Sequence, residues 1–164
     1  MDLLKKVLGP EHPHTLTSMH ILAATYSNQG KYEESEALQL KVLDLSKKVL
    51  GPEHPHTVTA MANLAVSYSY QEKYEEAEEL ELKVLDLRKK VLRPEHPDTL
   101  TSMANLARTY SDQGKYEEAG ELKRKVLHLC KMVLGPEHPD TLNAMANLAV
   151  SYSKHEKYDE AEEL

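Results

Sequence analysis

Nine histidines are the residues of this sequence best suited to binding a metal ion. Four of them recur at one place, in the tetrapeptide Pro-Glu-His-Pro, and these are His12, His54, His96 and His138. Packed helices lie about 8–10 Å apart, whereas a zinc–nitrogen bond is about 2 Å long. Histidines one repeat apart are therefore poorly placed to share a metal ion, and we interpret them as structural loop residues. The pairs His12–His14 and His54–His56 could scavenge surface metal weakly, but we predict no metal site and no cofactor.

Catalytic arrangements do not stand out in the sequence. Carboxylates form short runs such as Glu75–Glu76 that recur in every repeat, which is typical of a solvated helix face. No Ser/His/Asp or Cys/His constellation and no glycine-rich phosphate loop is apparent. The single cysteine, Cys130, allows no internal disulfide, and we expect it on an exposed or boundary face because Arg88 and Ser46 occupy its place in other repeats. We predict that the chain is not an enzyme.

The sequence contains an internal repeat of 42 residues, and the fold of this repeat must position any functional site. Pro-Glu-His-Pro begins at Pro10, Pro52, Pro94 and Pro136. A fixed period in this range is typical of a solenoid, in which each unit buries its apolar face against its neighbours. We divide the array 1–164 into the tail of a preceding helix at 1–8, repeats at 9–50, 51–92 and 93–134, and a truncated repeat at 135–164.

Each repeat encodes two amphipathic helices, which we name helix A and helix B. Apolar residues of the second repeat recur at helical spacing, in helix A at Val58, Met61, Leu64, Ala65 and Tyr68 and in helix B at Ala77, Leu80, Val84, Leu87 and Val91. Tyrosines at this spacing are interpreted as core and interface residues. We expect helix A at 13–29, 55–71, 97–113 and 139–155, and helix B at 32–50, 74–92 and 116–134. The predicted fold class is all-α, a right-handed α-solenoid of antiparallel helix pairs with no β-sheet.

Glycines mark the turns between these helices, with exceptions. Gly30 and Gly114 separate helix A from helix B, and Glu72 and Glu156 stand at that place in the other repeats. Arg93 replaces one of the glycines between repeats. If φ is positive at these positions, each non-glycine residue costs on the order of 1 kcal/mol.

Composition excludes several classes of partner. The formal net charge is −7, which argues against a nucleic-acid surface, where a basic stripe is expected. No apolar run approaches the roughly 18 residues of a membrane span, and the N-terminus lacks a signal-peptide layout. We therefore predict no nucleic-acid partner, no membrane partner and a cytoplasmic location.

The pattern resembles the tetratricopeptide repeat family. Leu64–Ala65 with Tyr68, then Glu72, Tyr74 and Ala77, follow the spacing of that family. The string LGPEHPDTLNAMANLA at 134–149 is most similar to the 42-residue variant of kinesin light chains, and to arrays attached to NACHT or NB-ARC NTPases. The chain departs from the family at Ser35, where other repeats have alanine. It also departs in mid helix B, where Gln39, Glu81 and Lys123 replace a large aromatic residue.

One stripe of helix A faces away from the apolar face, and its last two positions vary between repeats. Its residues are Thr59, Asn63, Val66 and Tyr70; Thr101, Asn105, Arg108 and Asp112; and Asn143, Asn147, Val150 and Lys154. The resemblance implies that helix A lines a concave groove and that Asn63, Asn105 and Asn147 contact the backbone of a ligand. An amide can pair with any peptide unit because it both donates and accepts hydrogen bonds. The same asparagines could instead bond to a neighbouring helix, and the sequence leaves both interpretations open.

The function we predict is a protein-interaction scaffold that receives an extended peptide or a partner helix in this groove. The alternative is a structural, self-assembling array, and a more distant one is a sensor segment of an NTPase. Self-association would be head to tail through two apolar ends, formed by Leu3, Leu4 and Val7 at one and by Tyr158, Ala161 and Leu164 at the other.

Overall fold

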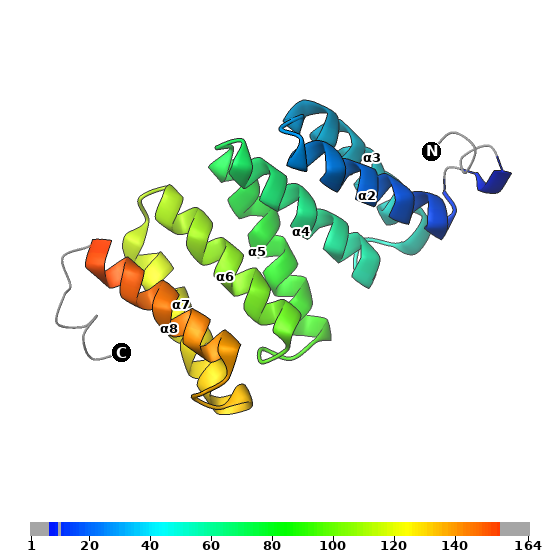
Figure 1. The fold of residues 1–164 in the computed structure, drawn as a ribbon. Coiled ribbons are helices and arrows are strands. Elements are labelled where there is room, and N and C mark those ends of the chain that lie inside the picture. Colours follow the sequence, from blue (N-terminus) through cyan, green and yellow to red (C-terminus); the bar gives the residue numbers. More distant parts are fainter. Residues whose placement is uncertain (1–6, 10, 155–164) are drawn as a thin grey trace. The chain divides into compact units, whose positions relative to one another are not determined.

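The computed structural model describes residues 7–9 and 11–154, which contain seven helices with defined bounds and no strand. The helices are α2 (Pro13–Asn28), α3 (Tyr32–Leu50), α4 (Pro55–Tyr70), α5 (Tyr74–Val91), α6 (Pro97–Asp112), α7 (Tyr116–Leu134) and α8 (Pro139–Lys154) (Figure 1). The even-numbered helices are the copies of helix A, and α3, α5 and α7 are the copies of helix B. Their bounds match the predicted ones to within a residue, and the predicted all-α solenoid class is confirmed.

The two ends of the chain are described only in part. Val7 and Leu8 are helical and exposed. The rest of the predicted preceding helix, including Leu3 and Leu4, lies outside the described residues. So do Glu156 and the apolar residues Tyr158, Ala161 and Leu164. Self-association through these ends therefore stays a prediction.

The chain divides into two compact units, residues 1–87 and 88–164. In the first unit, α3 packs against both α2 and α4. In the second unit, α7 packs in the same way against α6 and α8. Each unit thus contains two copies of helix A joined by the helix B between them, and the first unit also includes α5 as far as Leu87 (Figure 1). None of the described helices is both long and apolar enough to cross a membrane.

The repeated histidines cap the N-termini of the A helices. Proline occupies the first turn of α2, α4 and α6, and the preceding histidine is extended. The Nδ1 atom of His54 accepts a hydrogen bond of 3.2 Å from the backbone N–H of His56, and equivalent bonds form at His12, His96 and His138. A side-chain acceptor at this position satisfies a backbone donor that the helix leaves unpaired. These residues are structural, as predicted, but their capping role was not foreseen.

The turn from helix A to helix B requires a left-handed residue. Gly30 has φ of 74° and Gly114 has φ of 80°, while Glu72 adopts the same conformation with φ of 59°. A side chain at positive φ crowds the backbone, so Glu72 is in an unfavourable conformation. The predicted strain is therefore present at this turn.

Arg93 avoids the strain that its position predicts. At the equivalent place Gly51 has φ of 94° and ψ of 160°, a combination open almost only to glycine. Among the described non-glycine residues only Glu72 has a positive φ. The chain accommodates Arg93 because α5 ends at Val91, one residue earlier in the repeat than α3 and α7.

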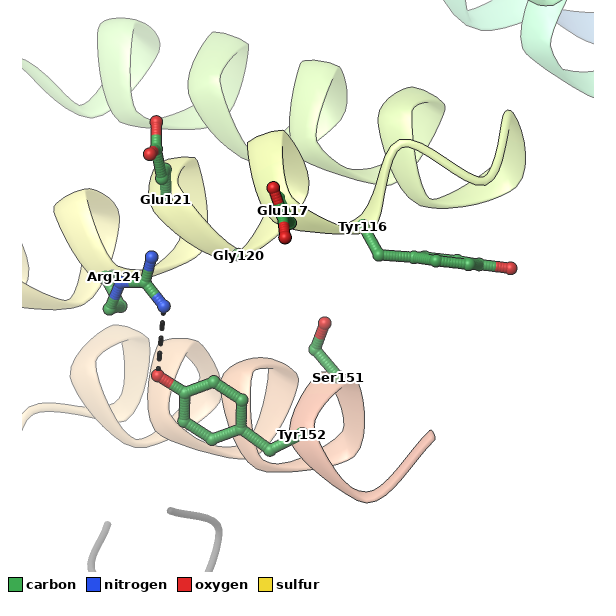
Figure 2. A pocket seen from close by; sticks show the side chains of 7 residues that line it. All are labelled: Tyr116, Glu117, Gly120, Glu121, Arg124, Ser151 and Tyr152. Atoms are coloured by element: carbon green, nitrogen blue, oxygen red, sulfur yellow. Dashed lines mark hydrogen bonds between the residues drawn. The ribbon is translucent and has the colours of Figure 1, made fainter. Parts of the chain in front are cut away.

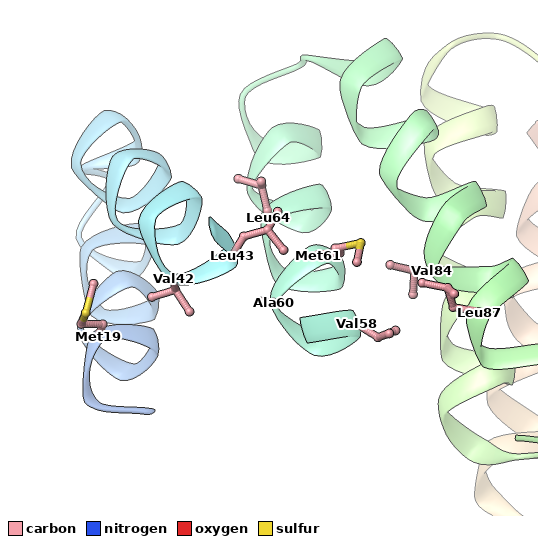
Figure 3. Close-up of a cluster of buried hydrophobic side chains, with 9 residues drawn as sticks. All are labelled: Met19, Val42, Leu43, Val58, Ala60, Met61, Leu64, Val84 and Leu87. Carbon is pink, nitrogen blue, oxygen red and sulfur yellow. The ribbon is translucent and has the colours of Figure 1, made fainter. Parts of the chain in front are cut away.

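The core of the first unit is built from both helix types (Figure 3). Met61, Leu64 and Ala65 of α4 are almost completely buried, as the helical spacing predicts. Met61 and Leu64 join a cluster with Met19 of α2, Val42 of α3 and residues of α5. Burial of this face against neighbouring helices supplies most of the stability of an amphipathic helix.

Cys130 is buried, with 3% of its surface exposed, so the predicted exposed or boundary position is wrong. The prediction relied on Arg88, which occupies the same place in the repeat. Arg88 extends along α6 and donates from Nη1 to the backbone oxygen of Asp98 (2.8 Å) and to Oγ of Ser102 (2.7 Å). The repeat position of Arg88 and Cys130 therefore faces the following helix A, which covers a short side chain such as that of Cys130. Burial, and then the nearby Asp140 carboxylate, raise the pKa of the Cys130 thiol.

The tyrosines of helix A lie at the edge of the core, and one expectation about helix B is wrong. Tyr26, Tyr68 and Tyr110 are half-buried, each with a lysine ammonium group of the following turn over its ring, and Tyr68 packs against the core cluster of the first unit. Val91 was assigned to the buried face of helix B but is 62% exposed. It ends α5 and lines an open recess with the loop residue Arg93 rather than packing under a helix.

Truncation of Leu64 tests the position of this core. Leu64 is 1% exposed, so Leu64→Ala should lower the free energy of unfolding by about 2–5 kcal/mol. Leu40 lies on α3 and is 44% exposed, so Leu40→Ala should change it by only about 0.5 kcal/mol. Urea unfolding of both variants measures the difference, and equal losses would contradict this arrangement of the core.

Glycine substitutions test the two turns against each other. Glu72→Gly should stabilise the protein by about 1 kcal/mol, because glycine adopts positive φ without crowding. Arg93→Gly should instead destabilise it by about 0.5–1 kcal/mol, because Arg93 is not at positive φ and glycine adds entropy to the unfolded chain. Thermal and urea unfolding measure both effects, and changes of the same sign would show that the two turns are misassigned.

Candidate functional site

The predicted stripe of helix A lies at the surface of the described chain. On α4, Thr59 and Tyr70 are exposed while Asn63 and Val66 are half-buried. On α6, Asn105 is half-buried, and the exposed members are Thr101, Arg108 and Asp112. On α8, the exposed members are Asn143, Asn147 and Val150; the side chain of Lys154 lies outside the described part. Such exposure leaves the stripe open to a partner.

A groove of about 360 Å³ runs between α6 and α8 in the second unit. One wall carries Asn105, Arg108 and Asp112, and the other carries Asn147 and Val150. It also includes Ala104, Ser111 and Ala144, with Lys123 and Val126 of α7 between the walls. The structure thus brings together five of the predicted site residues. Thr101 and Asn143 belong to the same helices but do not line this groove.

Lys123 is a groove residue that the sequence did not single out as functional. It comes from helix B, is half-buried, and donates from Nζ to Oγ of Ser111 over 3.1 Å. The only available signal was that a charged residue replaces the large aromatic side chain usual in the family. Because it projects between α6 and α8, helix B contributes a positive charge to a site that was expected to consist of helix A residues.

The equivalent residue of the first unit, Gln39, has a structural role instead. Its Nε2 atom donates to Oγ of Ser67 on α4 over 2.8 Å and contacts Oγ of Ser35 at 3.3 Å. Ser35 in turn donates to the backbone oxygen of Ala23 over 2.8 Å. All three side chains are buried, so the departure from alanine at Ser35 joins α3 to α2 while Gln39 joins α3 to α4.

The A helices of the first unit are bridged by a direct side-chain contact. Nδ2 of Asn63 on α4 meets Nε2 of His20 on α2. An amide nitrogen only donates, so Nε2 accepts in this arrangement and the imidazole is neutral. Burial, and then repulsion by His56, lower the pKa of His20. The sequence left open whether these asparagines bind a ligand or contact a neighbouring helix. Asn63 contacts the neighbouring helix α2 through His20.

A smaller hollow of about 180 Å³ lies beside this bridge. It is mostly apolar, with His20 and His56 among its lining residues together with Thr59. Neither there nor elsewhere in the described part of the chain do three His, Cys, Asp or Glu residues gather as a metal site. Nδ1 of His12 and of His54 is already occupied by the helix cap.

A further pocket lies between α7 and α8 (Figure 2). It is lined by Tyr116, Glu117, Gly120, Glu121, Arg124, Ser151 and Tyr152. Arg124 donates from Nη1 to the hydroxyl of Tyr152 over 3.3 Å. Gly120 contributes no side chain here, whereas Glu36 at the same place in the first unit pairs with Lys73 at 2.7 Å. The lining contains no histidine, lysine or cysteine that could activate Ser151 as a nucleophile.

Paired antiparallel helices repeated at a fixed step, with a surface groove between successive first helices, define a helical-repeat protein. The sequence model of the tetratricopeptide repeat matches residues 21–90, 82–127 and 105–164. The chain therefore belongs to the tetratricopeptide repeat family, as the spacing of its repeat residues predicts. Members of this family are protein-interaction scaffolds, and this is the general function that the family indicates for the chain.

Solved structures show the same fold. Two structures of a putative kinesin light chain with nearly identical tetratricopeptide-like repeats, from Podospora anserina, share 35% identity with this chain. One is a variant form, with a TM-score of 0.87, and the other form has a TM-score of 0.85. Both alignments cover 99% of this chain, and they cover 76% and 77% of those chains, respectively. BtubC from P. vanneervenii matches at 19% identity with a TM-score of 0.81, covering 90% of this chain and 59% of that one. Comparison with curated protein sequences gave no match.

The lowered pKa of His20 predicts a pH-dependent stability. The pKa of an unperturbed histidine is about 6.5. Below that pH the unfolded chain binds a proton at His20 that the folded chain resists, so the free energy of unfolding decreases as the pH is lowered. His20→Gln removes this titration but keeps a side chain able to reach Asn63. The free energy of unfolding, measured by urea titration from pH 7.5 to pH 5, should therefore fall more steeply in the wild type than in His20→Gln. Parallel slopes would show that His20 makes no such contribution.

Proposed function

We propose that the chain is a non-enzymatic scaffold that binds an extended segment of a partner protein in the groove between α6 and α8. The observation that carries this proposal is the pair of amides, Asn105 and Asn147, on opposite walls of the groove. Each amide offers both a donor and an acceptor, so each can pair with a peptide unit of any sequence. A backbone held between two such walls leaves its side chains to determine specificity.

The other lining residues suit an extended peptide better than a small molecule. The groove is open along α6 and α8 and combines apolar Val126 and Val150 with charged Arg108, Asp112 and Lys123. Small-molecule sites are usually enclosed and mostly apolar. Mixed lining along a groove favours a chain with several side chains spaced along it.

A random-peptide library displayed on phage provides a probe, because the natural partner is unidentified. The selected consensus peptide is synthesised and its affinity is measured by isothermal titration calorimetry. Replacing both amides, Asn105→Ala with Asn147→Ala, should weaken binding about tenfold or more. The reason is that two hydrogen bonds of about 0.5–1.5 kcal/mol each are lost.

The matched control is Asn28→Ala, which removes an exposed amide at the end of α2 in the first unit. This variant should bind the peptide as the wild type does. All variants should unfold within about 0.5 kcal/mol of the wild type, as expected for surface positions. Unchanged affinity in the double variant, or a large loss of stability, would contradict the proposal, as would a library that yields no binding peptide.

A further inference from the structure

The four capped A helices differ in the residue two places after the capping histidine. In the first unit this residue is a second histidine, His14 on α2 and His56 on α4. In the second unit it is an aspartate, Asp98 on α6 and Asp140 on α8. The first turn of α2 and of α4 therefore contains no acidic residue, whereas the first turn of α6 and of α8 contains one.

All four caps depend on a neutral imidazole. In each, Nδ1 of the capping histidine accepts a hydrogen bond of 3.2 Å from the backbone N–H two residues further on. A proton on Nδ1 turns this acceptor into a donor, so a charged ring cannot form the cap. Histidine is the side chain whose charge ordinarily changes between about pH 5 and pH 8. Mild acid therefore acts on an element that every repeat uses to begin its first helix.

In the first unit, protonation adds a repulsion to the loss of the cap. The ring of His14 stacks on that of His12 with the centroids 5.3 Å apart, and the ring of His56 stacks on that of His54 at 5.4 Å. Two charged rings at this distance repel each other. Both also lie at the positive end of the helix dipole, where a cation is unfavourable. Acid thus removes the cap and leaves like charges in its place.

In the second unit, protonation creates an attraction instead. Nδ1 of His96 lies 4.0 Å from Oδ2 of Asp98, and Nδ1 of His138 lies 3.8 Å from Oδ2 of Asp140. A charged imidazole forms an ion pair at these distances, and a carboxylate in the first turn is favourable at the positive end of the dipole. These side chains are exposed, so the ion pair is weak. Its sign is nevertheless opposite to that of two charged imidazoles.

The charged groups around the first-unit caps do not offset the repulsion. A glutamate precedes the capping histidine in every repeat, so it acts alike in both units. Glu11, moreover, is paired with Nζ of Lys48 on α3 at 2.7 Å. From α2, His20 faces His56, and burial followed by this repulsion lowers the pKa of His20. The residues of α3 that share a hollow with His56 are uncharged, namely Val42, Ser46 and Leu50.

The aspartates of the second unit face different groups. Nη1 of Arg88 on α5 donates to the backbone oxygen of Asp98 over 2.8 Å. Burial lowers the pKa of Arg88, and the Asp98 carboxylate opposes this shift. The thiol of Cys130 on α7 lies near Asp140. A guanidinium stays charged and a thiol stays neutral in mild acid, so neither neighbour adds positive charge as the pH falls.

We propose that the histidine caps make the first unit sensitive to acid: protonation uncaps α2 and α4, while Asp98 and Asp140 keep the first turns of α6 and α8 formed. The affected turns bound the hollow of about 180 Å³, to which α2 contributes Pro13, Leu16 and Thr17. Loosening of these turns opens the hollow and leaves the buried core in place. The device acts on α2 and α4, so it does not depend on the peptide site proposed between α6 and α8.

Four equivalent backbone amides report on the first turns. The N–H groups of Leu16 and Val58 in the first unit, and of Leu100 and Leu142 in the second, each donate to the backbone oxygen of the capping histidine over 3.0 Å. Hydrogen exchange of these amides is followed by nuclear magnetic resonance at pH 7.5 and pH 5.5 and corrected for the intrinsic effect of pH. Protection of the first-unit amides should fall about threefold or more, the scale of a lost cap. Protection of the second-unit amides should change by less than about twofold, as befits an exposed ion pair.

Exchange of the two residue types between the units tests the cause. His14→Asp with His56→Asp gives the first unit the aspartates of the second and should abolish the acid-dependent loss at its amides. Asp98→His with Asp140→His should transfer the loss to the second-unit amides. The matched control is His128→Asp, the same substitution at an exposed position in the middle of α7. This control should leave the responses of both units unchanged.

The outcomes decide between a local cap effect and a general effect of charge. Equal losses at all four amides of the wild type would overturn the inference, as would exchange variants that keep the wild-type pattern. A response of His128→Asp equal to that of the first-unit variant would show that net charge alone is responsible. Both exchange variants install a residue that another repeat already has at that place, so both should fold at pH 7.5, which circular dichroism checks. If one of them does not fold, the other still decides the inference.

Discussion

Burial of one face of helix A is the constraint on which the rest of the structure depends. Met61, Leu64 and Ala65 are almost fully removed from solvent, and this requires helices packed on that side. Each buried leucine-sized side chain contributes about 1.5–3 kcal/mol, so the face tolerates little change between repeats. The opposite stripe has no such requirement, which lets Val66, Arg108 and Val150 occupy one place in different repeats.

Differences between repeats change the surface between the A helices most where polar side chains lie between helices. His20 with Asn63, and Gln39 with Ser67, hold the A helices of the first unit through hydrogen bonds. Such bonds each add about 0.5–1.5 kcal/mol, less than the apolar core, but they decide whether a junction is filled. Lys123 occupies the place of Gln39 in the second unit and lines a groove instead. A repeat array can thus vary its binding surface without altering its core.

The sequence predicted the helices and their order because the period of 42 residues and the proline punctuation recur in every repeat. It also identified five residues of the α6–α8 groove, because a helix face that is not buried must lie at the surface. The groove contribution of Lys123 and the bridge from His20 were missed, because both depend on side chains reaching between helices. Cys130 was misplaced for a related reason: the long side chain of Arg88 suggested exposure at a position that faces helix A.

Mapping a bound peptide by nuclear magnetic resonance tests most directly whether the α6–α8 groove is the binding site. Side-chain and backbone signals of the isotope-labelled chain would be followed during titration with a peptide selected from the random library. The largest shifts are expected at Asn105, Lys123 and Asn147, with the signals of Gly120 and Tyr152 in the α7–α8 pocket nearly unchanged. Shifts concentrated in that pocket, or in the first unit, would contradict binding in the groove.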